Sequence, residues 1–296
     1  PVYTYSYREA VIDGWLVDHD PPYIINTEFI ENNVKFKKGE TLAEYDPNTN
    51  ELINGAVLED ELDFDVADFN RKIVLPDHTR KVLEEISTYI NPESDAKTLI
   101  FAVNDNHADS IVDTLRNIYK EFGISNEAII KITGKTASGN KKKILQVIKK
   151  FKNNQYPNIA VTVDLLTTGI DVPKICNLVF MRKINSRILF EQMLGRATRL
   201  CPEIGKTHFN IFDAVRVYED LDSTSGMKSV TVNKDMAELL EELFRQTGES
   251  KQQVKDRIIA RLQRKYGNLT EESKYEISER LGGIDLKAYA KNLKNS

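Results

Sequence analysis

The chain has 296 residues, enough for one to three domains with a buried core. Hydrophobic residues make up 41% and charged residues 29%, fractions typical of a globular protein, which excludes wholesale disorder. No stretch approaches the roughly 18 apolar residues that span a bilayer, so we expect no membrane partner. The formal net charge of −4 argues against a wholly basic surface but leaves room for a local basic strip.

The first residues and the cysteines suggest where the protein works. The chain starts at Pro1 without an initial Met or the pattern of a signal peptide, so we expect it to begin within a longer protein. Cys176 and Cys201 have no CxxC partner, which is typical of reduced thiols in a cytoplasmic protein. The four histidines are scattered, and we expect no metal site.

Residues 1–70 show no core-forming periodicity, and we interpret them as an irregular connector. Ser6 and Glu9 match a capping box, which predicts a short helix that Gly14 ends. Residues 23–30 are a possible strand. The rest of this region is mostly polar and acidic, with the composition of turns and loops.

From residue 71 onward, short apolar runs alternate with amphipathic helical patterns, as in Ile111, Val112 and Leu115. The runs lie at residues 98–103, 128–132, 159–163, 178–181 and 209–212. Apolar runs of this length are typical of strands buried on both faces. The alternation predicts an α/β domain over residues 71–222, a parallel sheet flanked by helices. In such a sheet, functional side chains lie at the carboxyl ends of the strands.

The end of the chain has a different pattern. Residues 223–226, Ser-Thr-Ser-Gly, are typical of a linker. Residues 229–296 are charged and helical in pattern, with Leu239 and Leu243 on one helix and Val254 on another. We expect a helical module that docks or braces.

The segment Phe-Glu-Gln-Met-Leu-Gly-Arg-Ala-Thr-Arg at residues 190–199 is the most informative. Arg196 and Arg199 lie three apart, so on a helix they would project from nearly the same face. Two guanidiniums together suit a triphosphate during phosphoryl transfer. Gln192, one turn earlier, could orient a water or a phosphate oxygen, and Gly195 would let a phosphate approach closely. Paired arginines alone would more often mark an exposed basic helix, so the context decides.

Three strand ends carry further candidates. The strand at 159–163 runs into a polar loop with Thr168, Gly169 and Asp171, whose hydroxyls and N–H groups could hold a phosphate. Asn104 follows the strand at 98–103, where a ligand contact and an ordinary helix N-cap are both possible. Thr133 and Gly134 begin a third loop. Gly134-Lys-Thr imitates the end of a Walker A loop, but Ile129 stands where that motif needs a Gly.

In order and spacing these segments resemble motifs IV, V and VI of superfamily 2 helicases. Gln-x-x-Gly-Arg-x-x-Arg at residues 192–199 matches the sixth motif, and Thr-Gly-Ile-Asp at 168–171 matches the fifth. The resemblance implies a second RecA-like lobe over residues 71–220. It implies that Arg196 and Arg199 act as arginine fingers, that Gly169 and Asp171 face the nucleotide, and that Thr162 and Thr168 lie near the nucleic acid. We interpret Thr133 and Gly134 as a loop touching the nucleic-acid backbone.

A finer resemblance is to the restriction subunit of type I restriction-modification enzymes. Residues 1–17, from Pro-Val-Tyr-Thr to Trp-Leu-Val, look like the segment after motif III in that family, and residues 182–192 look like the approach to motif VI. The resemblance implies a bacterial or archaeal, cytoplasmic, ATP-dependent DNA translocase and endonuclease. It also implies double-stranded DNA, a methyltransferase subunit and a specificity subunit as partners.

No Walker A loop, acidic D-E-x-H box or nuclease motif occurs in the sequence, so we expect ATP and Mg²⁺ to be bound mainly by another lobe of the intact protein. This fragment alone is then expected to be inactive. Two alternatives stay open: a lobe of another superfamily 2 helicase or remodeller, and a non-enzymatic module that docks DNA or the methyltransferase.

Overall fold

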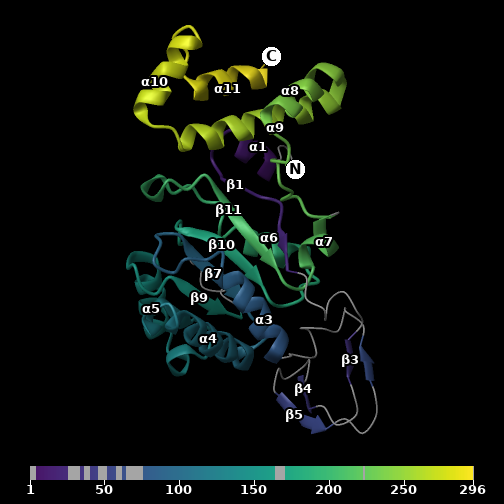
Figure 1. Cartoon of the computed structure of the whole chain (residues 1–296), viewed down its shortest axis with the longest axis vertical. Helices are drawn as coiled ribbons and strands as arrows, with labels where there is room; N and C mark the ends of the chain where they lie inside the picture. The colour runs from purple at the N-terminus through teal and green to yellow at the C-terminus, as the bar shows by residue number, and fades with distance from the viewer. Residues whose placement is uncertain are drawn as a thin grey trace.

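A computed structural model of the chain describes residues 5–25, 34–36, 41–45, 52–57, 62–64, 76–163, 171–222 and 224–295. Its main element is a seven-stranded parallel sheet in the order β1–β11–β10–β7–β9–β8, with β2 also paired to β11 (Figure 1). The strands are β1 (Asp18–His19), β2 (Tyr23–Ile24), β7 (Lys97–Phe101), β8 (Ile129–Lys131), β9 (Ile159–Thr162), β10 (Ile175–Phe180) and β11 (His208–Asp213). The five predicted apolar runs each overlap one of the last five strands, so the predicted parallel sheet is confirmed.

Alternate residues of each strand point to opposite faces of the sheet, which creates two cores. Leu99 and Phe101 of β7 enter one core, and Ile100 between them enters the other. The first core is covered by α5 (Lys141–Asn153), α6 (Arg187–Leu194) and α7 (Val217–Asp222), and the second by α3 (Pro76–Ser87) and α4 (Asp105–Lys120). Short 3-10 turns, η2 (Asn126–Ala128), η3 (Thr136–Gly139) and η5 (Pro202–Ile204), lie in the connections. This is the predicted α/β arrangement.

The N-terminal residues 5–25 are more ordered than a connector would be. Helix α1 (Tyr7–Ile12) begins at the predicted capping box, with the Ser6 hydroxyl accepting from the Glu9 N–H and the Glu9 carboxylate accepting from the Ser6 N–H. The helix ends just before Gly14, whose φ of 76° suits a residue without Cβ. Strands β1 and β2 then pair with β11, so this stretch forms the edge of the sheet.

Two antiparallel strand pairs occur where we expected irregular chain. Strand β3 (Val34–Phe36) pairs with β6 (Leu62–Phe64), and β4 (Thr41–Tyr45) pairs with β5 (Leu52–Val57). The expectation was wrong for these residues because strands of three to six residues with Lys, Glu and Asp among them carry too few apolar positions to show a period of two. The proposed boundary at residue 70 stays a prediction.

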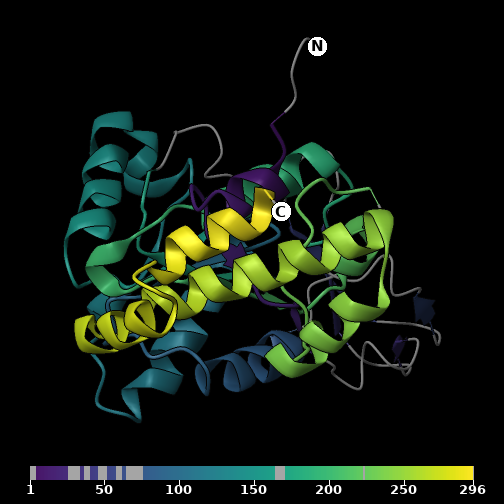
Figure 2. The same cartoon turned by 90° about the horizontal axis from the view of Figure 1, so that it is seen from above.

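The C-terminal residues form four helices, α8 (Met236–Arg245), α9 (Gly248–Gly267), α10 (Glu271–Arg280) and α11 (Leu286–Asn295). Ile259 and Ala260 of α9 pack with Val11 and Ile12 of α1 and Ala290 of α11, so the first helix of the chain belongs to the core of the last ones. Figures 1 and 2 show these helices together at the β1 edge of the sheet, with α11 beside α9. Within the described residues, every helix is too short or too polar to cross a membrane.

Candidate functional site

The first half of the segment at residues 190–199 belongs to α6, and the second half, which contains the two arginines, follows the helix. Ser186 caps the helix by accepting from the Leu189 N–H, and Phe190, Met193 and Leu194 anchor it in the core. The helix ends at Leu194, and Gly195 begins a turn. The expectation that Arg196 and Arg199 project from one helical face is therefore wrong, because both follow the last helical residue.

The two guanidiniums nevertheless act on each other. Burial lowers the pKa of Arg196, and the positive charge of Arg199 lowers it further. Both side chains are partly buried, whereas Gln192, one turn back on α6, is exposed. Two like charges held together at a half-buried surface form a site that an anion stabilises.

Asp171 lies beside this pair. Its carboxylate is 2.8 Å from a terminal nitrogen of Arg199 and 3.2 Å from Nζ of Lys152 on α5. All three side chains are partly exposed, so each contact is weak and replaceable. The fold thus brings together Asp171 of the fifth motif and Arg199 of the sixth, and it adds Lys152, which the sequence patterns did not indicate. Gly169 and Thr168 lie outside the described residues.

A second group of candidates lies at the carboxyl ends of three neighbouring strands, β7, β9 and β8. Asn104 follows β7, and its side-chain oxygen accepts from the His107 N–H at 2.8 Å, so it caps α4. Thr162 ends β9 and is fully buried. Among the residues that the structure describes, the Asn104 Nδ2 and the Thr162 Oγ1 have no hydrogen-bond partner although they are buried, an uncommon state for polar groups. Both predicted residues therefore lie at the predicted edge of the sheet.

Thr133 and Gly134 follow β8 at the same edge. The Thr133 hydroxyl donates to Asp105 at 2.5 Å, and Asp105 also pairs with Lys131 at 2.8 Å, so the loop is fastened to the start of α4. Gly134 is exposed, and a Cβ added there would meet no atom within 4 Å, so there is free space beside it. Lys135 is exposed as well.

The same edge carries a basic feature that lies outside the helicase-like motifs. Helix α5 follows this loop and starts with three exposed lysines, Lys141, Lys142 and Lys143, without an acid in its first turn. Cations at a helix N-terminus oppose the helix dipole, so a bound anion there would relieve the repulsion. The run of three lysines was the available signal for this surface.

Two buried lysines, Lys97 and Lys206, stabilise the fold by donating hydrogen bonds to backbone carbonyls. Lys97 donates to the carbonyls of Asn154, Gln155 and Pro157, which close the end of α5, and burial lowers its pKa to about 8. Lys206 donates to the carbonyls of Pro173 and Ile175 and likewise has its pKa lowered to about 8 by burial.

The chain matches the helicase conserved C-terminal domain family over residues 78–201. It is 50% identical over 234 residues to the endonuclease subunit of the type I restriction enzyme EcoKI of Escherichia coli K12, an alignment that covers 78% of this chain and 20% of that protein. It is 32% identical over 229 residues to the EcoAI endonuclease subunit of Escherichia coli, covering 74% of this chain and 25% of that protein. The chain thus spans a quarter or less of these relatives.

The fold has a counterpart among solved structures. A fragment of an HsdR subunit of a type I restriction enzyme from Vibrio vulnificus YJ016 superposes with a TM-score of 0.53 at 23% identity, over 77% of this chain and 38% of that one. At this identity the likeness concerns the fold, and it agrees with the RecA-like lobe and the helical C-terminal region expected from the sequence. Residues 78–201 of the chain are therefore a helicase C-terminal domain, of the kind carried by endonuclease subunits of type I restriction enzymes.

Proposed function

We propose that the chain is the second motor lobe of an ATP-dependent DNA translocase in a type I restriction endonuclease, and that it is inactive without the other lobe. The observation that carries the proposal is the meeting of Arg196, Arg199 and Asp171 at one surface. The 50% identity to the EcoKI endonuclease subunit supports the choice of system. Because the chain covers 20% of that relative, the activity belongs to the whole protein.

The arginine pair fits the phosphates of ATP. Arg196 and Arg199 supply several N–H donors and two positive charges that repel each other, and the growing charge on phosphate oxygens in the transition state would offset that repulsion. Arg199 has a partly exposed partner in Asp171, so it can exchange the carboxylate for a phosphate at low cost. Gln192, exposed on the preceding turn, would orient a water or a phosphate oxygen. ATP with Mg²⁺ would be held mainly by the other lobe, with Gly169, Asp171 and Gly195 facing it from this one.

The carboxyl edge of β7, β9 and β8 fits a DNA backbone. The exposed Gly134, the hydroxyl-rich loop after Thr133 and the three lysines that begin α5 provide donors and positive charge along one edge. Thr162, Thr168 and Asn104 complete the proposed nucleic-acid contacts. Double-stranded DNA is the proposed track, and methyltransferase and specificity subunits are the proposed partners in the cytoplasm.

The arginine assignment is tested by Arg199→Ala in the full-length endonuclease subunit. Removal of an arginine finger costs about 10³ to 10⁵ in rate, so DNA-stimulated ATP hydrolysis should fall by at least about a thousandfold while the complex still assembles. The matched control is Arg187→Ala, which removes an exposed arginine from the first turn of the same helix α6. Hydrolysis near the wild-type rate in Arg199→Ala would refute the proposed role.

The DNA edge is tested separately by the triple variant Lys141→Ala, Lys142→Ala and Lys143→Ala. Each phosphate contact contributes about 0.9 to the slope of log K against log salt concentration. The triple variant should therefore lower that slope by up to about 2.7, measured by DNA binding of the full-length subunit across a salt series. An unchanged slope would remove α5 from the interface.

A further inference from the structure

A segment from the start of the chain lies directly against the arginine segment. We call residues 15–20 the strap. Leu16 forms an antiparallel bridge with Arg199, and the Val17 N–H donates to the Thr198 carbonyl at 2.8 Å. The strap then continues as β1, which pairs with β11 at the edge of the sheet. The backbone of Arg199 is therefore held on one side by the strap.

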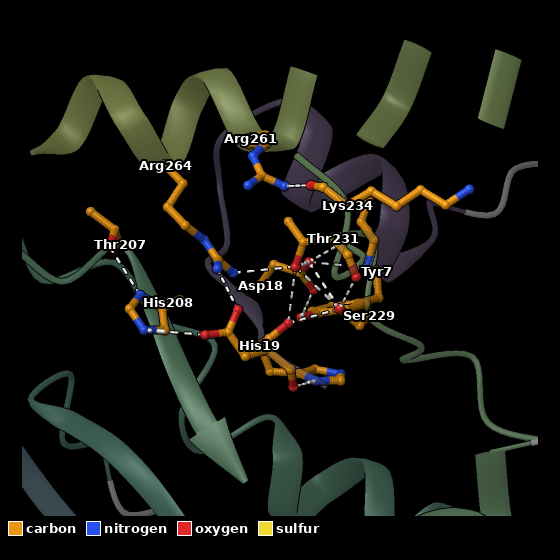
Figure 3. A network of polar contacts seen from close by, with 12 residues as sticks. Tyr7, Asp18, His19, Thr207, His208, Ser229, Thr231, Lys234, Arg261 and Arg264 are labelled. Carbon is orange, nitrogen blue, oxygen red and sulfur yellow. Dashed lines mark hydrogen bonds and ion pairs between the residues drawn. The ribbon is translucent and has the colours of Figure 1, made fainter. Parts of the chain in front are cut away.

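One buried carboxylate of the strap accepts several hydrogen bonds from distant parts of the chain. Asp18 is 4% exposed, and its Oδ2 accepts from the Val230 N–H at 3.0 Å, from the Thr231 N–H at 2.7 Å and from the Thr231 hydroxyl at 3.0 Å. Its Oδ1 accepts from the Tyr7 hydroxyl at 3.1 Å. Figure 3 shows these donors converging on Asp18 from α1 and from residues 229–231, the chain that leads into α8. We call Asp18 with residues 229–231 the clasp.

The clasp also joins the strap to the C-terminal helices. Arg264 of α9 forms an ion pair with Asp20, and its guanidinium donates to the Thr231 hydroxyl at 3.3 Å (Figure 3). Beside these contacts a cavity of about 420 Å³ separates the strap from α9, lined by Leu16, Leu200, Gln263 and Arg264 among others. Leu16 also packs against the apolar cluster that contains Ile259 and Ala260 of α9, and the polar contacts of Asp18 and Asp20 add to this attachment.

We propose that Asp18 is a positioning residue for Arg199: the clasp fixes the strap, and the strap fixes the backbone that presents the arginine. The inference rests on the proposed role of Arg199 in ATP hydrolysis. Asp18 lies one residue after Val17, whose N–H holds Thr198, and two after Leu16, which bridges Arg199. Hydrogen bonds to a charged carboxylate are stronger than those to a neutral amide, so Asn at position 18 would weaken the contacts with the N–H groups of Val230 and Thr231 and let the strap shift. A displacement of about 1 Å at a reacting group can cost about a hundredfold in rate.

The test is Asp18→Asn in the full-length endonuclease subunit, assembled in its complex. We expect kcat for DNA-stimulated ATP hydrolysis to fall about tenfold, with the KM for ATP within about twofold of wild type, because positioning acts in the transition state. The matched control is Asp213→Asn. Asp213 is also a buried carboxylate that accepts backbone N–H bonds, from Val215, Val217 and Tyr218, but those donors lie outside the strap and the arginine segment. A similar fall in kcat in both variants would reduce the role of Asp18 to stability and overturn the inference.

A double variant separates positioning from a general structural effect. Residues that act as a unit give non-additive losses, so Asp18→Asn should lower kcat by much less in an Arg199→Lys background than in the wild type. Equal factors in both backgrounds would overturn the inference. If Asp18→Asn does not assemble, Thr231→Val removes one donor to Asp18 and keeps the N–H, and it should show the same pattern with a loss of about threefold.

Arg199→Ala, measured alongside, separates the two proposals. Hydrolysis near wild type in Arg199→Ala would refute the proposed function. Hydrolysis abolished in Arg199→Ala but unchanged in Asp18→Asn would refute the strap alone.

Discussion

Asp171 and Asp18 show two ways in which this chain uses a carboxylate. Asp171 is about half exposed and meets two charged side chains, Arg199 and Lys152. Asp18 is buried and is surrounded by N–H groups and hydroxyls at fixed places on the backbone. Exposed ion pairs are worth roughly 0 to 1 kcal/mol, whereas breaking a buried, fully bonded charge costs several kcal/mol. The first arrangement suits partners that must exchange during a reaction cycle, and the second suits a joint that must not move.

The largest effect is expected at the site of Arg196, Arg199 and Asp171, where we propose that ATP binds. In the full-length subunit, Arg196→Ala should lower DNA-stimulated ATP hydrolysis by about 10³ or more, because the second guanidinium at the phosphates is lost. The unfolding free energy should change by less than about 1 kcal/mol, since the Arg196 side chain is partly exposed. Steady-state ATPase assays and urea unfolding measure the two quantities. A large loss of stability together with a modest loss of rate would make Arg196 a structural residue.

The second prediction concerns stability and separates the two carboxylates directly. Asp18→Ala should lower the unfolding free energy of the purified chain by about 3 kcal/mol, because the N–H groups of Val230 and Thr231 stay buried without an acceptor. Asp171→Ala should change it by less than about 1 kcal/mol. Urea unfolding of both variants under the same conditions gives the comparison. Equal losses of unfolding free energy would mean that the contacts of Asp18 stabilise the chain no more than those of Asp171.

The buried histidine His107 differs from both carboxylates, because burial shifts its pKa and so makes stability depend on pH. Burial lowers the pKa of His107 to about 3, with a further lowering from nearby His78, so His107 is neutral in the folded chain. The unfolded chain binds a proton near pH 6.5, so stability is full above that pH and is lost as the pH falls toward 3. Between pH 7 and pH 5 this residue alone should remove about 2 kcal/mol of unfolding free energy.

His107→Gln provides the check on that value. Its amide oxygen can still accept from the Val103 N–H, which now donates to His107 Nδ1, and its charge does not change with pH. Unfolding measured at pH 7 and pH 5 should show a smaller acid-induced loss in the variant than in the wild type. An equal loss in both would assign the acid sensitivity to other groups.

The sequence predicted those parts of the molecule whose signal is local. The apolar runs became strands because a strand buried on both faces needs continuous apolar residues. Arg196 and Arg199 were proposed as site residues from their spacing to Gln192 and Gly195, and that assignment stays a prediction. Their helical placement was wrong because α6 stops at Leu194.

Other features depend on contacts between distant residues, which no local pattern contains. Lys152 and Asp171 lie 19 residues apart and meet only because α5 and the end of the motif V loop converge. Strand β1 has two residues, too few to show a period of two. The sequence around Asp18 does not distinguish it from a surface acid, because the Val230 and Thr231 N–H groups that it accepts from lie more than 200 positions away in the chain. The clasp could therefore be found only in the folded structure.

The smallest expected effect lies within the exposed site itself. Lys152→Ala removes one of the two cations that contact Asp171, so the carboxylate should bind Arg199 more strongly. Because Arg199 would then exchange the carboxylate for a phosphate less readily, kcat for ATP hydrolysis should fall about two- to fivefold, the equivalent of an exposed ion pair. Lys152→Arg should restore the rate because it returns the positive charge. Lys150→Ala is the matched control, an exposed lysine of the same helix whose partner is Glu127. Since salt screens exposed charges within about 10 Å at 0.1 M, the deficit should shrink as salt is added. A deficit that is independent of salt would show that Lys152 acts through packing and not through the charge of Asp171.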